Sequence, residues 1–176
     1  LELYRSNVET YDIDCGYEQK DGYVFSQDEK QTEELQKMFD SSKKVGVEVA
    51  YTDRIPVPIE FEKAIVYREQ ANVHASRYVF ALAKAFEDAG GVIVQNCRVE
   101  DFKGDRILEV QTSQGVIKAN VLIWATHIPP GINLLHFRCA PYRSYAMAVT
   151  LNDEAYPDGL AYDMYDPYHY YRTQDI

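Results

Sequence analysis

The residues that first suggest chemistry stand where the most apolar run of the chain stops. Val121–Trp124 is followed by Ala125, Thr126 and His127, and the chain then meets two prolines. A small residue and a hydroxyl at the end of a buried strand let its backbone come close to a bound ligand, and the prolines fix the exit of the chain. Taken alone, the same run is also typical of a plain core strand.

A second group of residues could bind a carboxylate. Arg143 and Tyr145 begin the next strand-like segment, and Tyr170 and Arg172 stand in the tyrosine-rich segment YDMYDPYHYYR. An arginine binds a carboxylate through two parallel hydrogen bonds, which suits an amino acid. The alternatives are an arginine paired with one of the 28 acidic residues, and tyrosines on an exposed β-surface, where their propensity is high.

Metal binding and acid–base pairs have little support in the sequence. The most metal-like group consists of Asp158, Asp163, Asp166 and His169. We interpret these residues as turn aspartates and a solvated histidine, since sites for hard metals need a more concentrated set of oxygen ligands. The sequence contains no G-x-G-x-x-G, P-loop or Gly-x-Ser-x-Gly motif, and its cysteine and histidine spacings match no zinc site. We therefore expect no catalytic dyad and no metal.

The composition is that of a chain with an ordinary hydrophobic core. Of the 176 residues, 46% are hydrophobic and 26% are charged, which is typical of a globular protein. The formal net charge of −10 argues against a nucleic-acid partner, because phosphate binding needs concentrated basic charge. No apolar run approaches the ~20 residues that span a membrane, and the opening residues lack the pattern of a signal peptide. Three scattered cysteines indicate reduced thiols and a cytoplasmic location.

Two helices are predicted to carry much of the core. The first follows Ser26 and Glu29, which have capping-box spacing, and it ends after a pair of lysines. The second has the strongest pattern in the chain, because it begins near Ala75, repeats apolar residues at helical spacing and ends at Gly90-Gly91. Phe86 lies on its apolar stripe and is expected to be buried.

After the second helix the apolar period changes to two, which is typical of strands. Strands are predicted within residues 23–26, 47–52, 62–70, 91–102, 106–126 (a hairpin), 144–151 and 159–172 (two strands around an Asp-Pro turn). We expect the helix over 75–89 to pack on a sheet that includes Val92–Val94 and Val121–Trp124. Helices come early and strands dominate late, so we predict an α+β fold with a mixed, largely antiparallel sheet and flanking helices, in a single domain over residues 1–176.

The order of these segments resembles that of a known family. The pieces are, in chain order, His74-Ala75, Tyr78 with Leu82, Gly91–Val99, Thr112–Gly115 and Val121–His127. This succession of helix, strand, turn and apolar strand is similar to that of the FAD-dependent D-amino-acid oxidase and glycine oxidase superfamily. The resemblance covers residues 60–176 and rests on the order and spacing of the pieces.

The resemblance implies that FAD is the cofactor. In that family the strand end that corresponds to Ala125, Thr126 and His127 lies beside the FAD, and the segment that corresponds to Arg98 and Val99 meets the adenine through its backbone. His127 stands where glycine is common in the family, so the approach to the cofactor is altered at that position.

The resemblance also implies a small-molecule amine or amino-acid substrate. The family's strand that corresponds to the segment of Arg143 and Tyr145 passes near the flavin ring and the substrate cavity. Tyr170 and Arg172 are the candidates for the aromatic wall of that cavity. Hydride would leave the substrate's α-carbon for the flavin, in an oxidase or a dehydrogenase, and no residue of the chain is expected to act as an acid or base.

The family's N-terminal phosphate-binding fingerprint and its acidic ribose anchor have no counterpart in these residues. We therefore expect the chain to be an internal fragment of a larger enzyme, containing the substrate domain and parts of the FAD domain, with the remainder of the parent chain as its partner. Such a fragment is expected to be inactive and to bind FAD weakly by itself. The competing hypothesis is a non-catalytic binding module whose tyrosine-rich surface contacts sugars or a protein partner.

Overall fold

The computed structural model of the chain describes residues 2–126, 142–152 and 155–173. The chain forms two compact units: unit 1 contains residues 1–91 and 150–176, and unit 2 contains residues 92–149. Unit 2 is therefore an insertion in the sequence of unit 1. The expectation of a single domain over residues 1–176 stays a prediction.

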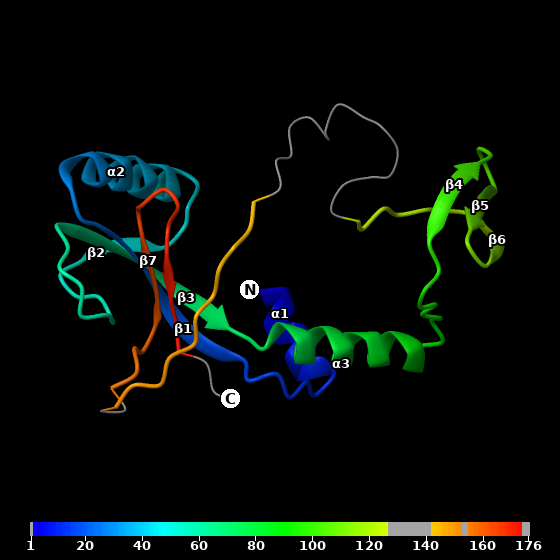
Figure 1. Cartoon of the computed structure of the whole chain (residues 1–176), viewed down its shortest axis with the longest axis horizontal. Coiled ribbons are helices and arrows are strands. Elements are labelled where there is room, and N and C mark those ends of the chain that lie inside the picture. The colour runs from blue at the N-terminus through cyan, green and yellow to red at the C-terminus, as the bar shows by residue number, and fades with distance from the viewer. Residues whose placement is uncertain (1, 127–141, 153–154, 174–176) are drawn as a thin grey trace. The chain divides into compact units, whose positions relative to one another are not determined.

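Unit 1 is built on a five-stranded sheet with the order β2-β3-β1-β7-β8 (Figure 1). The central strand β1 (Glu18–Ser26) pairs antiparallel with β3 (Lys63–Asn72) and parallel with β7 (Leu160–Asp163). The outer strands β2 (Val49–Thr52) and β8 (Tyr170–Tyr171) run antiparallel to β3 and β7. One parallel pair among antiparallel ones confirms the predicted α+β fold with a mixed, largely antiparallel sheet.

Helix α2 (Glu29–Lys44) lies across one face of this sheet (Figure 1). Its Leu35 is fully buried with Val49 of β2 and Ile65 of β3, which makes this contact the centre of one hydrophobic cluster. Partly buried apolar side chains surround the cluster, among them Phe39 of the helix. The helix is held because its apolar stripe meets a sheet face that is apolar at the same place.

The helix α2 begins differently from the prediction. Asp28 is the N-cap residue, and its carboxylate accepts a hydrogen bond of 2.8 Å from the backbone N–H of Gln31. The predicted capping box is wrong because Ser26 belongs to β1, where its hydroxyl lies 2.7 Å from the hydroxyl of Thr32. The helix itself and its end after the lysine pair are confirmed.

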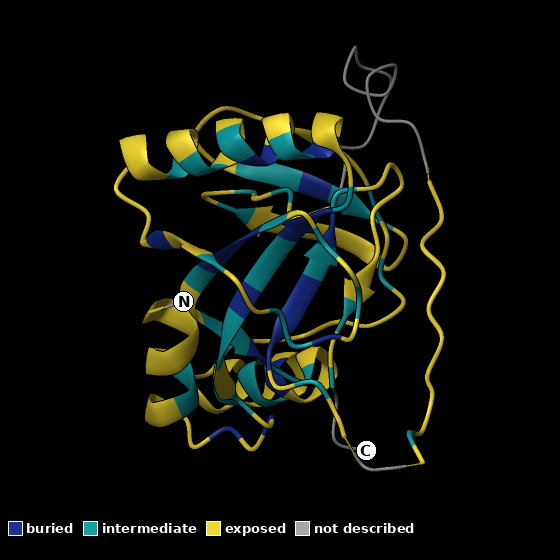
Figure 2. Cartoon of the chain, turned by 90° about the vertical axis from the view of Figure 1, so that its left-hand side faces the viewer, coloured by how far each residue is buried: buried dark blue, intermediate teal, exposed yellow. Residues whose placement is uncertain are grey.

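The opposite face of the sheet is covered by the loop over residues 53–62. Phe25, Ala64 and Ala161 are fully buried there with Val57 of that loop. Figure 2 shows the buried residues in dark blue along the middle of the strands. Strand β7 therefore contributes to the core although it lies more than 130 residues after β1 in the sequence.

Two further helices belong to unit 1. Helix α3 (Ala75–Asp88) matches the predicted second helix, and Gly90, with φ of +89°, follows its end as expected. Helix α1 (Glu2–Thr10) was missed by the sequence analysis because it is short and buries none of its residues. The two helices meet at Tyr78, whose hydroxyl accepts a hydrogen bond of 2.8 Å from the side-chain amide of Asn7.

Unit 2 contains a three-stranded antiparallel sheet with the order β4-β5-β6. Its strands are β4 (Val99–Lys103), β5 (Leu108–Thr112) and β6 (Gly115–Ala119). The tight connection at Ser113-Gln114 confirms the predicted hairpin between β5 and β6. Among the described residues of this unit only Val110 is buried, so the sheet has a small core.

Three predicted strands are wrong in the part of the chain that is described. Val92–Val94, Val121–Trp124 and residues 144–151 are irregular, although their apolar patterns are typical of strands. The side chains of Val121 and Ile123 are 70% and 80% exposed. A strand exists only where a partner strand satisfies its backbone groups, and these segments lie against none in the described structure.

The expected burial of Phe86 is also wrong. Its side chain is 52% exposed, and its ring packs on Gly91 just beyond the helix rather than on a sheet. Helix α3 packs through Tyr78, Ala81 and Leu82, whereas Val79 and Phe80 are exposed. Within the described residues, no helix combines the length and apolar character needed to cross a membrane.

The burial pattern predicts how the two helices differ in their contribution to stability. Leu35→Ala should lower the free energy of unfolding by about 2–5 kcal/mol, because it leaves a cavity in a closed cluster. Val79→Ala in α3 should lower it by less than about 0.5 kcal/mol, because Val79 is exposed. Urea unfolding followed by circular dichroism measures both values. Equal costs would show that α2 is not the main cover of the sheet.

Candidate functional site

The predicted adenine-contacting residues lie at the start of β4. The backbone N–H of Ser113 donates to the carbonyl of Arg98 at 2.9 Å, and the Ser113 hydroxyl accepts from the backbone N–H of Arg98 at 3.0 Å. Arg98 is therefore tied to the β5–β6 turn. The next residue, Val99, stands opposite Thr112 in the register of the ladder.

The register of the ladder predicts the direction of the Val99 backbone. In an antiparallel ladder, successive residues direct their N–H and C=O alternately toward and away from the partner strand. The carbonyl of Arg98 accepts the backbone N–H of Ser113, so we expect the N–H and C=O of Val99 to face the outer side of β4, an edge strand among the described residues, just before the register shifts between Val99 and Asp101. One donor and one acceptor side by side match the edge of a heteroaromatic ring such as adenine.

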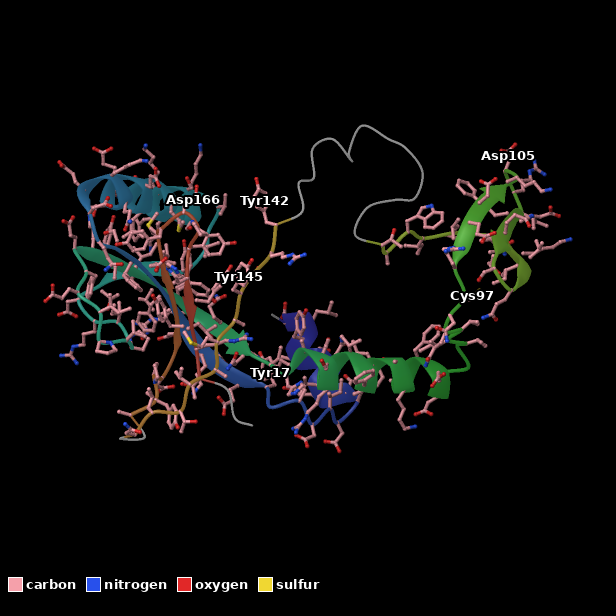
Figure 3. The ribbon with its side chains drawn as sticks, in the orientation of Figure 1. Tyr17, Cys97, Asp105, Tyr142, Tyr145 and Asp166 are labelled. Carbon is pink, nitrogen blue, oxygen red and sulfur yellow. The ribbon has the colours of Figure 1, made fainter. Side chains whose placement is uncertain are left out.

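The other predicted cofactor residues lie outside regular structure. Ala125 and Thr126 are exposed and belong to no strand, and His127 lies outside the described residues. The predicted substrate residues Arg143 and Tyr145 are exposed on an irregular segment of unit 2, on which Figure 3 labels Tyr145. The structure therefore does not bring Arg143 and Tyr145 into contact with a pocket.

Tyr170 and Arg172, the remaining predicted substrate residues, belong to the β7–β8 hairpin of unit 1. The ring of Tyr170 packs edge-on against Tyr162 and Tyr168, with ring centroids 4.9 and 5.1 Å apart. Burial raises the pKa of Tyr162, and the positive charge of Arg172 partly offsets this rise. These four side chains form a tyrosine–arginine cluster on one face of the hairpin.

The hairpin also holds a buried carboxylate that the sequence analysis did not predict. Asp163 is 4% exposed. Its Oδ1 accepts the backbone N–H groups of His169 at 2.8 Å and Tyr165 at 3.3 Å. Its Oδ2 lies 2.6 Å from His169 Nδ1 and accepts the hydroxyl of Tyr171 at 3.4 Å. Asp163 does bind the backbone of the turn and His169 is exposed, as interpreted from the sequence, but the burial of Asp163 and its contact with the imidazole were not predicted.

The pairing depends on the hairpin turn, which Figure 3 marks at Asp166. Asp163 ends β7 and His169 precedes β8, so the two residues face each other only when the strands pair. The sequence contains a usable signal, an aspartate and a histidine six residues apart around an Asp-Pro turn. Nothing in the composition distinguishes this pair from the neighbouring Asp158 and Asp166.

A cavity of about 270 Å³ opens in unit 1 between the beginnings of β1 and α3. Glu18 and Asp158 in its lining carry formal charges that balance those of Lys20 and Arg77. Lys20 already contacts Asp158 at 2.7 Å and Glu18 at 3.4 Å. The lining therefore favours neither an anion nor a cation. Among the described residues, no group of three or more His, Cys, Asp or Glu side chains could hold a metal ion.

Comparisons with known proteins identify the family of this chain. The family model described as "DAO: FAD dependent oxidoreductase" matches residues 1–175. The chain belongs to this family. The putative Rieske 2Fe-2S iron-sulfur protein YhfW of Bacillus subtilis (strain 168) is 28% identical over 163 residues, which are 91% of this chain and 32% of that protein.

Solved structures share the fold at low sequence identity. Glycine oxidase from Geobacillus kaustophilus has a TM-score of 0.56 at 18% identity, covering 68% of this chain and 34% of its own. L-proline dehydrogenase from P. horikoshii has a TM-score of 0.57 at 18% identity, with coverages of 68% and 34%. L-amino acid deaminase from Proteus vulgaris has a TM-score of 0.57 at 17% identity, with coverages of 68% and 31%. The chain thus spans about one third of the length of these relatives.

The buried carboxylate gives the hairpin a measurable pH dependence. Burial raises the pKa of Tyr171 above its ordinary value of 10.0, and the negative charge of Asp163 raises it further. A tyrosine whose pKa is higher in the folded state stabilises the fold fully below its unfolded value, and this contribution is lost as the pH rises through the folded value.

We therefore predict that Tyr171→Phe reduces the loss of stability between about pH 8 and about pH 11, because the neutral ring no longer has to ionise. Urea unfolding at both pH values measures the loss. The matched control is Tyr145→Phe, which removes a hydroxyl from a side chain that is 91% exposed and should leave the loss unchanged. An identical loss in the wild type and Tyr171→Phe would contradict the role assigned to Asp163.

Proposed function

We propose that this chain is part of an FAD-dependent oxidoreductase that oxidises an amino acid or a related amine, and that it supplies the substrate domain and parts of the FAD domain. The observation that carries the proposal is the family match over residues 1–175. Glycine oxidase, L-proline dehydrogenase and L-amino acid deaminase share the fold, and the name of each enzyme contains an amino acid. A cytoplasmic location, favoured by the scattered cysteines, belongs to the same proposal.

The residues of unit 2 fit one part of the FAD. The outward N–H and C=O of Val99 offer the paired donor and acceptor that an adenine edge needs, and Arg98 is fixed beside it by Ser113. Ala125, Thr126 and His127 would adjoin the flavin end, where small side chains leave room for the cofactor. When bound, the FAD would supply the chemistry by accepting a hydride from the substrate's α-carbon. These contacts are few, so residues 1–176 by themselves should bind FAD weakly.

The substrate would be held by charge and aromatic contacts. Arg143 and Arg172 carry guanidinium groups that can bind a carboxylate through two hydrogen bonds. Tyr145 and Tyr170 can add hydroxyl contacts and exclude water from the reacting carbon. The tyrosine–arginine cluster supports this role for Tyr170 and Arg172, because its rings are already packed into one apolar wall with a cation beside it.

The relative from Bacillus subtilis favours one class of electron acceptor. Its name describes a Rieske iron–sulfur protein. An amine oxidation whose two electrons leave one at a time through such a cluster, toward a further acceptor, would be a dehydrogenase reaction rather than an oxidase reaction. Iron and acid-labile sulfide in the purified full-length protein would support this acceptor, and their absence, with hydrogen peroxide formed from oxygen, would support an oxidase.

Anaerobic mixing of the full-length protein with a panel of amino acids and amines tests the function directly. A substrate should bleach the flavin absorbance. Arg143→Lys should raise the substrate concentration needed for half-maximal bleaching about tenfold or more, since lysine keeps the charge but loses the two-bond geometry. Arg106→Lys, at the exposed β4–β5 turn, is the matched control and should change nothing.

Unchanged half-saturation in Arg143→Lys would remove Arg143 from the substrate site. A folded, FAD-containing protein that no amine reduces would contradict the proposed reaction. A folded full-length protein that takes up no FAD would favour the alternative of a non-catalytic binding module with a tyrosine-rich surface.

A further inference from the structure

We propose that His169, positioned by Asp163, accepts the proton that the substrate's ammonium group loses before oxidation. This inference rests on the proposed function and names the group that prepares the substrate for it. The observation behind it is that the two oxygens of the buried Asp163 carboxylate bind different groups. Oδ1 binds the backbone of the turn, and Oδ2 binds the imidazole.

The hydrogen bonds that hold the turn do not involve the imidazole ring of His169. The turn is held by the two backbone N–H groups on Oδ1, at 2.8 and 3.3 Å, and neither involves the ring of His169. The ring is held separately by the 2.6 Å contact between Nδ1 and Oδ2. A ring that served only the turn would not need a fixed orientation, whereas a ring that exchanges protons does.

The contact with Asp163 prepares the other ring nitrogen for proton transfer. A carboxylate that accepts Nδ1–H fixes the tautomer in which Nε2 carries a free lone pair. The side chain of His169 is 59% exposed while that of Asp163 is 2% exposed, so Nε2 is accessible to a ligand and the carboxylate is not.

Aromatic side chains surround the pair of Asp163 and His169. The ring centroid of Tyr165 lies 6.1 Å from that of His169, and the hydroxyl of Tyr171 shares Oδ2. On the side of strand β1, the ring of Phe25 packs on Tyr171.

The location agrees with the proposed substrate contacts. His169 directly precedes Tyr170, and β8 is the edge strand of its sheet among the described residues. Tyr170 faces the tyrosine–arginine cluster, while His169 and Tyr171 face Asp163. A substrate bound at this edge would have to contact the cluster and Nε2 together.

The proton step balances without any further reactant. An amino acid at neutral pH carries an ammonium group, whose nitrogen has no lone pair to assist hydride loss from the α-carbon. One N–H bond breaks, its electron pair stays on the nitrogen, and the proton forms an N–H bond at Nε2 of His169. When FAD is bound, it would accept a hydride from the α-carbon of the neutral amine, and the imidazolium of His169 would return its proton to water.

The test is the pH dependence of flavin reduction in the full-length protein, measured anaerobically by stopped flow. His169→Asn should slow reduction by at least about 100-fold near pH 7, the usual range for loss of a general base. The rate should recover at alkaline pH, where the free substrate amine is already neutral. The matched control His74→Asn changes the histidine that caps α3 and should keep the wild-type rate and pH profile.

A second variant and a second readout guard against misfolding. Asp163→Asn should slow flavin reduction as well, because the imidazole loses the carboxylate that orients it. In nitrogen NMR spectra of the chain, His169 should be the Nδ1–H tautomer, and Asp163→Asn should abolish that preference. Added imidazole should restore part of the rate in His169→Ala.

Each result decides between the proposals. If no amine reduces the flavin even in the wild type, the proposed function fails and this inference fails with it. If an amine reduces it and His169→Asn keeps the rate and pH profile within about twofold, only the role of His169 is overturned. An Nε2–H tautomer in the NMR spectra would also overturn it.

Discussion

The structure of unit 1 depends on the parallel pairing of β1 with β7. In this pairing Gly22 to Phe25 lie beside Leu160 to Asp163, so the chain returns to its first strand after the whole of unit 2. The pairing buries Ala161 against Phe25 and takes the carboxylate of Asp163 out of water. A buried carboxylate needs partners, and the backbone of the turn and the ring of His169 provide them. The hairpin that carries the tyrosine–arginine cluster is therefore placed by this one long-range contact.

The sequence predicted those elements whose stability is local. Helix α3 follows from its apolar period and Gly90, and the β5–β6 hairpin follows from two alternating runs around a short turn. The sequence predicted a mixed sheet. It did not predict the order of the strands, because β1 and β7 are neighbours in the sheet but distant in the sequence. Helix α1 gave no usable period since none of its residues is buried.

The failures have a common physical cause, which is that strand pairing and pairing of side chains depend on tertiary structure. Val121–Trp124 has a strand-like sequence, yet it has no partner strand in the described structure and stays irregular. For the candidate site, the types of Tyr170 and Arg172 could be identified from the sequence. The link between Asp163 and His169 could not, because it exists only once β7 and β8 have paired.

The exposed apolar residues are consistent with a chain that covers one third of its relatives' length. Phe80 on α3 is 74% exposed, and Ile123 and Met147 in unit 2 are 80% and 87% exposed. Exposed apolar patches are typical of surfaces that contact further protein.

The measurement that tests this account most directly is the FAD affinity of the full-length protein with a proline at each edge of the unit 2 sheet. Val99→Pro removes the outward N–H at the edge of β4 without breaking a ladder bond, and Val116→Pro does the same at the edge of β6. The account predicts a yellow protein whose FAD affinity falls roughly 2–10-fold in Val99→Pro, the effect of one lost hydrogen bond, and stays unchanged in Val116→Pro. A folded protein that binds no FAD, or equal affinities in the two variants, would contradict it.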